Sequence, residues 1–321
     1  MAVGEQSGTR RETGAYLILT VMVLIGSSTA TAAKLASREI PIGLMPLVRF
    51  GLAGVCLLPL VWKDLGRIWR EDRGRLLAAS AFCVPINQTF FLNGNHLAPT
   101  SHTGLIYASC PLVVLLLVTA LGQERLRPER LVGVLASVLG VIVIGLGNLG
   151  RAGTGGSQAL WGDLLLIGAV VSWGAYLTVN KPLVVRHRPL PVLAATFLVG
   201  SLLHLPVAAV TMSHWGPALR TASWGAWTSL IYMALIASVL GLACQNIALR
   251  RFDASQVAIV SNISPVLTVV WGLLLLGEAM TPALALGGAL TLGGVLWSNR
   301  PMRAKIRVKP VAAHRVDEAV A

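Results

Sequence analysis

An internal repeat constrains this chain more than any other feature of its sequence. Residues 110–128 read CPLVVLLLVTALGQERLRP, and residues 264–282 read SPVLTVVWGLLLLGEAMTP. An offset of 154 positions superimposes two prolines and a glutamate around an apolar run, and two later glycines follow in register. The aligned pairs are Pro111 with Pro265, Glu124 with Glu278, Pro128 with Pro282, Gly133 with Gly287 and Gly140 with Gly294. Because a fixed offset marks a repeated structural unit, we expect two halves with one architecture.

The composition indicates that both halves are surrounded by lipid. Only 12% of the residues are charged and 55% are hydrophobic, whereas a soluble domain carries about 25% charged residues. A membrane-spanning helix needs about 20 mostly apolar residues. Ten runs meet this requirement, at residues 15–34, 42–62, 76–97, 100–121, 131–149, 160–180, 190–212, 224–247, 254–276 and 282–299. The runs are continuously apolar, which favours helices over the alternating strands of a membrane barrel.

The 26 basic residues concentrate on alternate connections between these runs. With the N-terminus in the cytoplasm, the loops expected outside hold only Arg38, Arg151 and Arg220. Positive charge marks the cytoplasmic side, so the sequence predicts both termini in the cytoplasm of a multi-pass cell-membrane protein. The net charge of +13 then reflects membrane orientation rather than nucleic-acid binding. The basic segment 300–321 is expected to contact anionic headgroups of the lipid bilayer.

Five spans in each half require the second half to enter the membrane from the opposite side. We therefore expect an all-α membrane protein made of two inverted five-helix repeats. The predicted parts are a cytoplasmic tail at 1–14, a first repeat at 15–149, an outer linker at 150–159, a second repeat at 160–299 and a basic cytoplasmic tail at 300–321. Lys34 aligns with Lys181 at an offset of 147, so residues 15–34 are interpreted as a retained span rather than a cleaved signal peptide. The offset between the halves grows from 147 to 154 along the repeat, so the second half contains extra residues, which we expect near HWGPALRTASWG.

These features resemble the EamA type of the drug/metabolite transporter superfamily. The residues that carry the resemblance are Arg49 in LMPLVRFGLAG, the repeated proline, glutamate and glycine sets, and WGDLLLIGAVVSWGAYLTVNK at the start of the second repeat. The resemblance covers nearly all of residues 15–299. It implies ten helices and secondary transport of small metabolites or drugs, often export, through a central cavity. The first repeat departs from the usual LGEA by reading GQER, and we expect little functional consequence from this difference.

Arg49 is the first candidate for substrate binding, because a charge in the middle of a span marks a functional site. The alternative is a structural role, in which the guanidinium contacts helix carbonyls or a cavity water. Its counterpart in the second half is Thr196, so the scaffold does not need this charge twice. Asn87 and Gln88 lie near the middle of the polar third span and should face the cavity or another helix. Residues 93–96 are interpreted as an interfacial helix end.

Two prolines in equivalent positions predict helix kinks that expose carbonyls to the cavity. Pro111 and Pro265 each lie about halfway along a span, and discontinuities at matching positions point to the binding site of a transporter. A packing kink is the alternative interpretation of each proline. Tyr107 and Asn262 lie one turn before these prolines and are predicted to meet the substrate. Trp173 and Tyr176 on the sixth span are predicted aromatic walls of the cavity.

Several titratable residues have simpler interpretations. Asp163 is expected to stabilise the first turn of the sixth span, and proton relay is the minor alternative. Glu124 and Glu278 are expected to cap the helices that open near Pro128 and Pro282. His102 and His204 could carry protons, but a single histidine is more often a packing residue.

The predicted function is secondary transport of a small-molecule substrate by alternating access, with export of an amino-acid-like or amphiphilic metabolite favoured. A non-transporting structural protein and, less favoured, a membrane-embedded enzyme are the alternatives. The sequence contains none of the paired carboxylates, GxSxG or HExxH that an enzyme of this kind would need, so no catalytic residue, metal or cofactor is expected. Proton coupling, the substrate, the direction of transport and the oligomeric state stay open.

Overall fold

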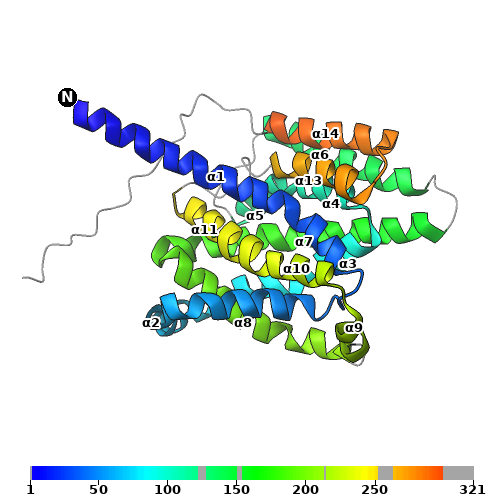
Figure 1. Ribbon diagram of the computed structural model, residues 1–321. Coiled ribbons are helices and arrows are strands. Elements are labelled where there is room, and N and C mark those ends of the chain that lie inside the picture. The colour runs from blue at the N-terminus through cyan, green and yellow to red at the C-terminus, as the bar shows by residue number, and fades with distance from the viewer. Residues whose placement is uncertain (1, 122–127, 150–153, 213–214, 252–262, 299–321) are drawn as a thin grey trace, which may run out of the picture.

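The computed structural model describes residues 2–121, 128–149, 154–212, 215–251 and 263–298 (Figure 1). Every element of these residues is helical. The first half contains α1 (Ala2–Ala36), α2 (Met45–Ala81), the π-helical segment η1 (Phe82–Ile86), α3 (Asn87–Leu97), α4 (Thr100–Tyr107), α5 (Cys110–Ala120) and α6 (Pro128–Leu149). The second half contains α7 (Thr154–Arg186), α8 (Pro189–Val210), α9 (Trp215–Thr221), α10 (Trp224–Tyr232), the π-helical segment η3 (Met233–Gly241), α11 (Leu242–Arg251), α13 (Ile263–Leu276) and α14 (Pro282–Ser298).

Prolines begin many of these helices, because a proline in the first turn removes an N–H that would have no partner there. Helix α14 starts at Pro282, which confirms the opening predicted there, and α6 is described from Pro128 onward. At α14 the preceding Thr281 supplies the cap, since its hydroxyl accepts a hydrogen bond of 3.1 Å from the Leu284 N–H. Local sequence therefore fixes where the second repeat begins its last helix.

Six described helices are long and apolar enough to cross a membrane, and one of them, Met45–Leu97, runs through 53 residues. This run contains a reversal of the chain at Asp72, where φ is −138° and ψ is 31°. A Cβ atom added to Gly54 would contact Leu198, and one added to Gly200 would contact Val84. Residues near 54 and 84 therefore lie beside the same part of α8, as expected for two passes. The count of ten spans stays a prediction.

The last helices of the two repeats, α6 and α14, pack antiparallel at close range. A Cβ added to Gly140 would lie 2.5 Å from the Gly287 carbonyl oxygen, and one added to Gly294 would lie 2.5 Å from the Gly133 carbonyl oxygen. The two contacts are equivalent under the repeat, since Gly133 aligns with Gly287 and Gly140 with Gly294. The two helices run in opposite directions, because the earlier residue of α6 contacts the later residue of α14. This reciprocal, antiparallel contact is the geometry that an inverted repeat produces.

Helices α2 and α8 form a second antiparallel pair on the opposite side of the bundle (Figure 1). Close neighbours along this pair are Gly43 with Thr211, Gly51 with Ser201 and Gly54 with Leu198. Helices α1, α3, α4, α7, α11 and α13 lie between the two pairs. The short helix α9 occupies the stretch where the sequence predicts extra residues in the second half. The two outer pairs thus enclose a central group of helices drawn from both halves.

Lys34 and Lys181, aligned by the repeat, make equivalent contacts in the two halves. Lys34 Nζ donates to the carbonyl oxygens of Asn95, His96 and Ala98, at 2.7, 2.9 and 2.9 Å, where α3 ends. Lys181 Nζ donates to the carbonyl oxygen of Leu249 near the end of α11. A cation near the final carbonyls of a helix stabilises that end. Each repeat therefore uses the last turns of its first span to cap its third.

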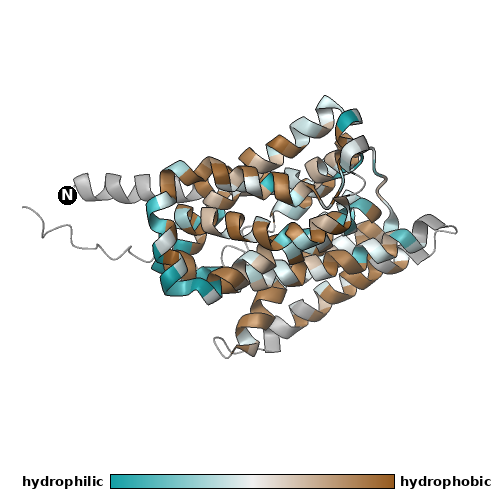
Figure 2. Ribbon diagram, turned by 90° about the horizontal axis from the view of Figure 1, so that it is seen from below, coloured by the Kyte–Doolittle hydropathy of each residue, from teal (hydrophilic) through white to brown (hydrophobic). Residues whose placement is uncertain are grey.

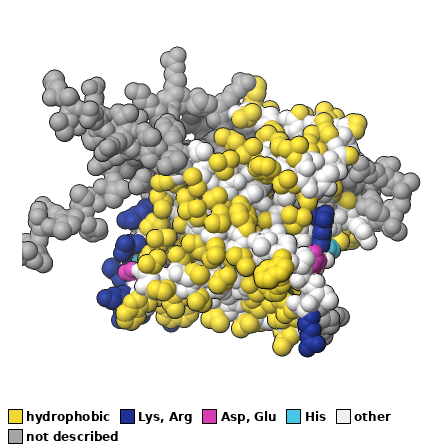
Figure 3. Space-filling view, in the orientation of Figure 1, with side chains coloured by type: hydrophobic (Ala, Val, Ile, Leu, Met, Phe, Trp, Pro, Cys, Tyr) yellow, Lys and Arg dark blue, Asp and Glu magenta, His cyan; other side chains and the backbone are white. Residues whose placement is uncertain are grey.

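Hydrophobic residues predominate in the helices between the two ends of the bundle (Figure 2), and hydrophobic side chains cover most of the described surface visible in Figure 3. Large apolar side chains such as Leu60, Leu202 and Leu274 are 73%, 65% and 72% exposed, which suits a lipid environment. We name the two ends by their residues. The Lys34 end contains Lys34, Glu39, Ala98, Asp163 and Glu278, and the Asp72 end contains Lys63, Asp72, Arg75, Arg186 and His187. In Figure 3, Lys and Arg side chains gather most densely at the Asp72 end, on the left.

Candidate functional site

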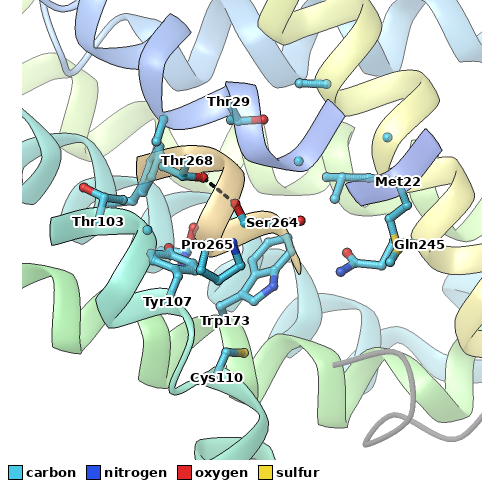
Figure 4. Close-up of a pocket in the computed structure, with 18 of the residues that line it drawn as sticks. Met22, Thr29, Thr103, Tyr107, Cys110, Trp173, Gln245, Ser264, Pro265 and Thr268 are labelled. Atoms are coloured by element: carbon cyan, nitrogen blue, oxygen red, sulfur yellow. Dashed lines mark hydrogen bonds between the residues drawn. The ribbon is translucent and has the colours of Figure 1, made fainter. Parts of the chain in front are cut away.

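A cavity of about 190 Å³ lies in the middle of the bundle, with walls from both halves (Figure 4). Seven residues predicted from the sequence line it. They are Arg49, Asn87, Gln88, Tyr107, Pro111, Trp173 and Pro265. Tyr176 lies behind the wall, where its ring centroid is 4.9 Å from that of Trp173 and its hydroxyl accepts a hydrogen bond from Asn180. Asn262 falls outside the described residues.

Arg49 is held in α2 with its guanidinium buried at the cavity wall, and the side chain is only 5% exposed. Its Nε donates to the Ser238 hydroxyl at 2.8 Å, and its Nη1 donates to the Gln88 side-chain oxygen at 3.3 Å. The guanidinium also lies 4.7 Å from the centre of the Phe50 ring. Among the described residues, no carboxylate forms an ion pair with Arg49. The cavity therefore contains a cation whose described partners are all neutral.

A chain of polar side chains extends from Arg49 across the cavity wall. Gln88 Nε2 donates to the Asn87 side-chain oxygen at 2.9 Å. Asn87 Nδ2 in turn donates to the Ala169 carbonyl at 2.8 Å and to the Ser172 and Tyr107 hydroxyls at 3.2 and 3.3 Å. Asn87 and Gln88 thus face the cavity and also join helices. The sequence predicted that Asn87 and Gln88 face either the cavity or another helix, and in the structure they do both.

Two π-helical segments place the partners of Arg49. The segment η1, which contains Pro85, directly precedes Asn87 and Gln88, and η3 carries Ser238. They lie in corresponding parts of the two repeats, and π-helical turns inside longer helices are frequent at functional sites. The sequence analysis did not identify Ser238, and its only signal was a hydroxyl among small residues in a run otherwise apolar.

The predicted helix discontinuity at Pro111 takes the form of a break. Helix α4 ends at Tyr107 and α5 begins at Cys110, so Pro111 stands in the first turn of a new helix. Pro265 is the third described residue of α13, and its carbonyl oxygen would be 2.9 Å from a Cβ added to Gly104. Figure 4 shows Tyr107, Pro265 and Trp173 close together on one side of the cavity. The two repeat-related segments therefore meet at the cavity.

The structure corrects two expectations about carboxylates. Glu278 is not a local cap, because its two oxygens accept from the backbone N–H groups of Thr100 and Ser101, at 2.5 and 2.8 Å, in the other half. Asp163 is not in a first turn, because α7 begins at Thr154. Its carboxylate instead pairs with His102 Nδ1 at 2.9 Å. Both carboxylates tie α4 to the second half at the Lys34 end.

Two further expectations concern polar residues near the Lys34 end. Residues 93–96 lie at the end of α3, as expected, but Asn95 is buried among helices, since its amide donates to the Ala30 carbonyl and its side-chain oxygen accepts from Thr103. His204 is a packing residue, as expected, with Nε2 positioned 3.1 Å from the Gly43 carbonyl oxygen.

A lipid-facing helical bundle with antiparallel helix pairs between its halves, around a central cavity that holds a few polar groups, is typical of a multi-pass membrane transporter. The chain belongs to the EamA-like transporter family, whose sequence model matches it twice, over residues 12–146 and 160–300. This confirms the resemblance drawn from the repeated motifs.

Named relatives include the uncharacterized transporter YetK of Bacillus subtilis (strain 168), 26% identical over 89% of this chain and 87% of the relative. A probable terminal-alkyne amino-acid exporter of Streptantibioticus cattleyicolor is 28% identical over 72% of this chain and 76% of its own. The threonine/homoserine exporter RhtA of Salmonella typhimurium (strain SL1344) is 25% identical over 95% of this chain and 98% of the relative. A crystal structure shares the fold with a TM-score of 0.61 at 22% identity, covering 89% of this chain and 97% of that one.

Proposed function

We propose that this protein exports a small metabolite bearing a carboxylate, of the amino-acid type, by alternating access across the cell membrane. The observation that carries the proposal is Arg49, a buried cation in the cavity wall with neutral described partners. A carboxylate is the natural ligand for such a guanidinium, because it accepts two parallel N–H bonds. Two relatives named as amino-acid exporters support the same substrate class.

The size of the cavity also favours a small substrate. Its volume of about 190 Å³ is below the roughly 300–1,000 Å³ of drug-sized sites. The wall combines a few polar groups with the apolar and aromatic surfaces of Phe91, Tyr107 and Trp173. This combination suits a metabolite with one charged end and a compact body better than a large cationic dye.

Alternating access is supported by the reciprocal contacts of the two halves around a central cavity. In this arrangement the Asp72 end, where basic side chains gather, is the cytoplasmic end. The Lys34 end is then outside. It is closed by contacts between the halves, so a substrate bound at Arg49 would leave only after these contacts part.

The test is counterflow exchange by the purified protein in liposomes. The panel contains L-amino acids, the amines that result from removing their carboxylates, simple organic acids and cationic dyes. Exchange of amino acids but not of the matched amines is expected. Exchange of dyes and amines alone would refute the carboxylate-based proposal, and no exchange in any class would favour the non-transporting alternative.

A further inference from the structure

Gln245 places a side-chain amide at the wall of the cavity. The residue is 7% exposed on α11, and it lines the cavity together with Ala237, Gly241 and Leu242 on one face of the η3–α11 helix. Its side-chain oxygen is buried and has no hydrogen-bond partner among the described residues. Figure 4 shows this amide directed into the cavity on the side away from Thr103. A buried acceptor without a donor is unfavourable, so a donor from an occupant would be stabilising.

The position of Gln245 along its helix decides which donor it can meet. Ser238, the partner of Arg49, lies seven residues earlier on the same helix, which is about 10 Å along the axis. The α-ammonium of an amino acid is attached to the carbon that carries the carboxylate. A carboxylate bound at Arg49 therefore keeps that ammonium near Arg49. Only a group at the far end of the substrate reaches Gln245.

We propose that Gln245 forms a second subsite, which accepts a hydrogen bond from a donor at the far end of an amino-acid substrate. The inference rests on the proposed function and narrows its substrate class to amino acids whose side chains carry a hydroxyl or another N–H or O–H donor. Arg49 holds the carboxylate and Gln245 selects the side chain. A site built to bond a substrate hydroxyl rejects an analogue of the same shape that lacks it.

The test compares pairs of similar shape that differ in one donor: L-homoserine with L-norvaline, L-threonine with L-valine, and L-tyrosine with L-phenylalanine. In the best transported pair, the donor-bearing member should compete about tenfold better in counterflow. Gln245→Leu should abolish this preference, and Gln245→Glu, which keeps an acceptor, should retain it. Thermal stability should not fall in Gln245→Leu, because the oxygen it removes has no hydrogen-bond partner among the described residues.

Three results would overturn the subsite. They are the absence of any donor preference in the wild-type protein, an unchanged preference in Gln245→Leu, and a large loss of stability in that variant. Each leaves the carboxylate requirement at Arg49 intact, so failure of the subsite is distinct from failure of the proposed function.

Discussion

Replacing Arg49 by methionine should remove most of the affinity for a carboxylate-bearing substrate. The Nε and Nη1 atoms of Arg49 are engaged by Ser238 and Gln88, while Nη2 has no partner among the described residues. A carboxylate that takes two charge-assisted bonds, each worth about 1.5–3 kcal/mol, would gain roughly 3–6 kcal/mol. We therefore expect affinity to fall by about 10²–10⁴-fold. Arg49→Lys keeps the positive charge but lacks the planar guanidinium that binds a carboxylate through two parallel hydrogen bonds, and its affinity should fall by about tenfold.

The assay is a four-way comparison in proteoliposomes, with wild-type protein and Arg49→Met each tested on an amino acid and on its decarboxylated amine. The ratio of the two substrates isolates the carboxylate from any general damage to the cavity. Folding is checked by size-exclusion profile and thermal shift. Equal losses for amino acid and amine would refute the reasoning, because Arg49 would then support the wall rather than bind the carboxylate.

Three other expectations follow from contacts described above. Glu278→Gln should lower stability by about 1–2 kcal/mol in a thermal-shift assay, because α4 loses a charged cap. Gly140→Leu should reduce the yield of folded protein, since even a Cβ there meets α14 at 2.3 Å, whereas Gly293→Ala, with open space, should not. The N–H and hydroxyl of Ser223 lower the pKa of Glu39. The contact between Glu39 and Ser223 should persist above the ordinary carboxyl pKa of about 4.3 and weaken as the pH falls through the lowered pKa. Hydrogen exchange of the Ser223 amide, corrected for intrinsic rates, should therefore rise in acid, and Glu39→Gln should abolish this rise.

Sequence patterns predicted features that depend on local chemistry or on the repeat. The helix start at Pro282 follows from the restricted φ of proline. The alignment of Lys34 with Lys181 anticipated two equivalent lysines, although not what they contact. A charge placed in the middle of a span drew attention to Arg49 before its position in the cavity wall was known. Its role in binding stays a prediction.

The sequence could not predict contacts between residues far apart in the chain. Ser238 meets Arg49 across 189 positions and Glu278 meets Thr100 across 178, and no local pattern encodes such pairs. Asp163 was misplaced because α7 begins at Thr154, in a glycine-rich stretch that is a poor helix former. Gln245 was undervalued because its lack of a hydrogen-bond partner becomes visible only when the surrounding helices are in place.

The π-helical segments have a mechanical consequence. A π turn contains one residue more than an α turn, so a helix that loses it must rotate everything on one side of it by about 100°. In η3 such a rotation would turn Ser238 away from Arg49, and in η1 it would turn Asn87 and Gln88 away from the cavity. Moving a π turn along its helix would thus rotate one part of the helix about its own axis. This rotation would exchange polar for apolar side chains on the cavity wall, while every helix kept its place in the bundle.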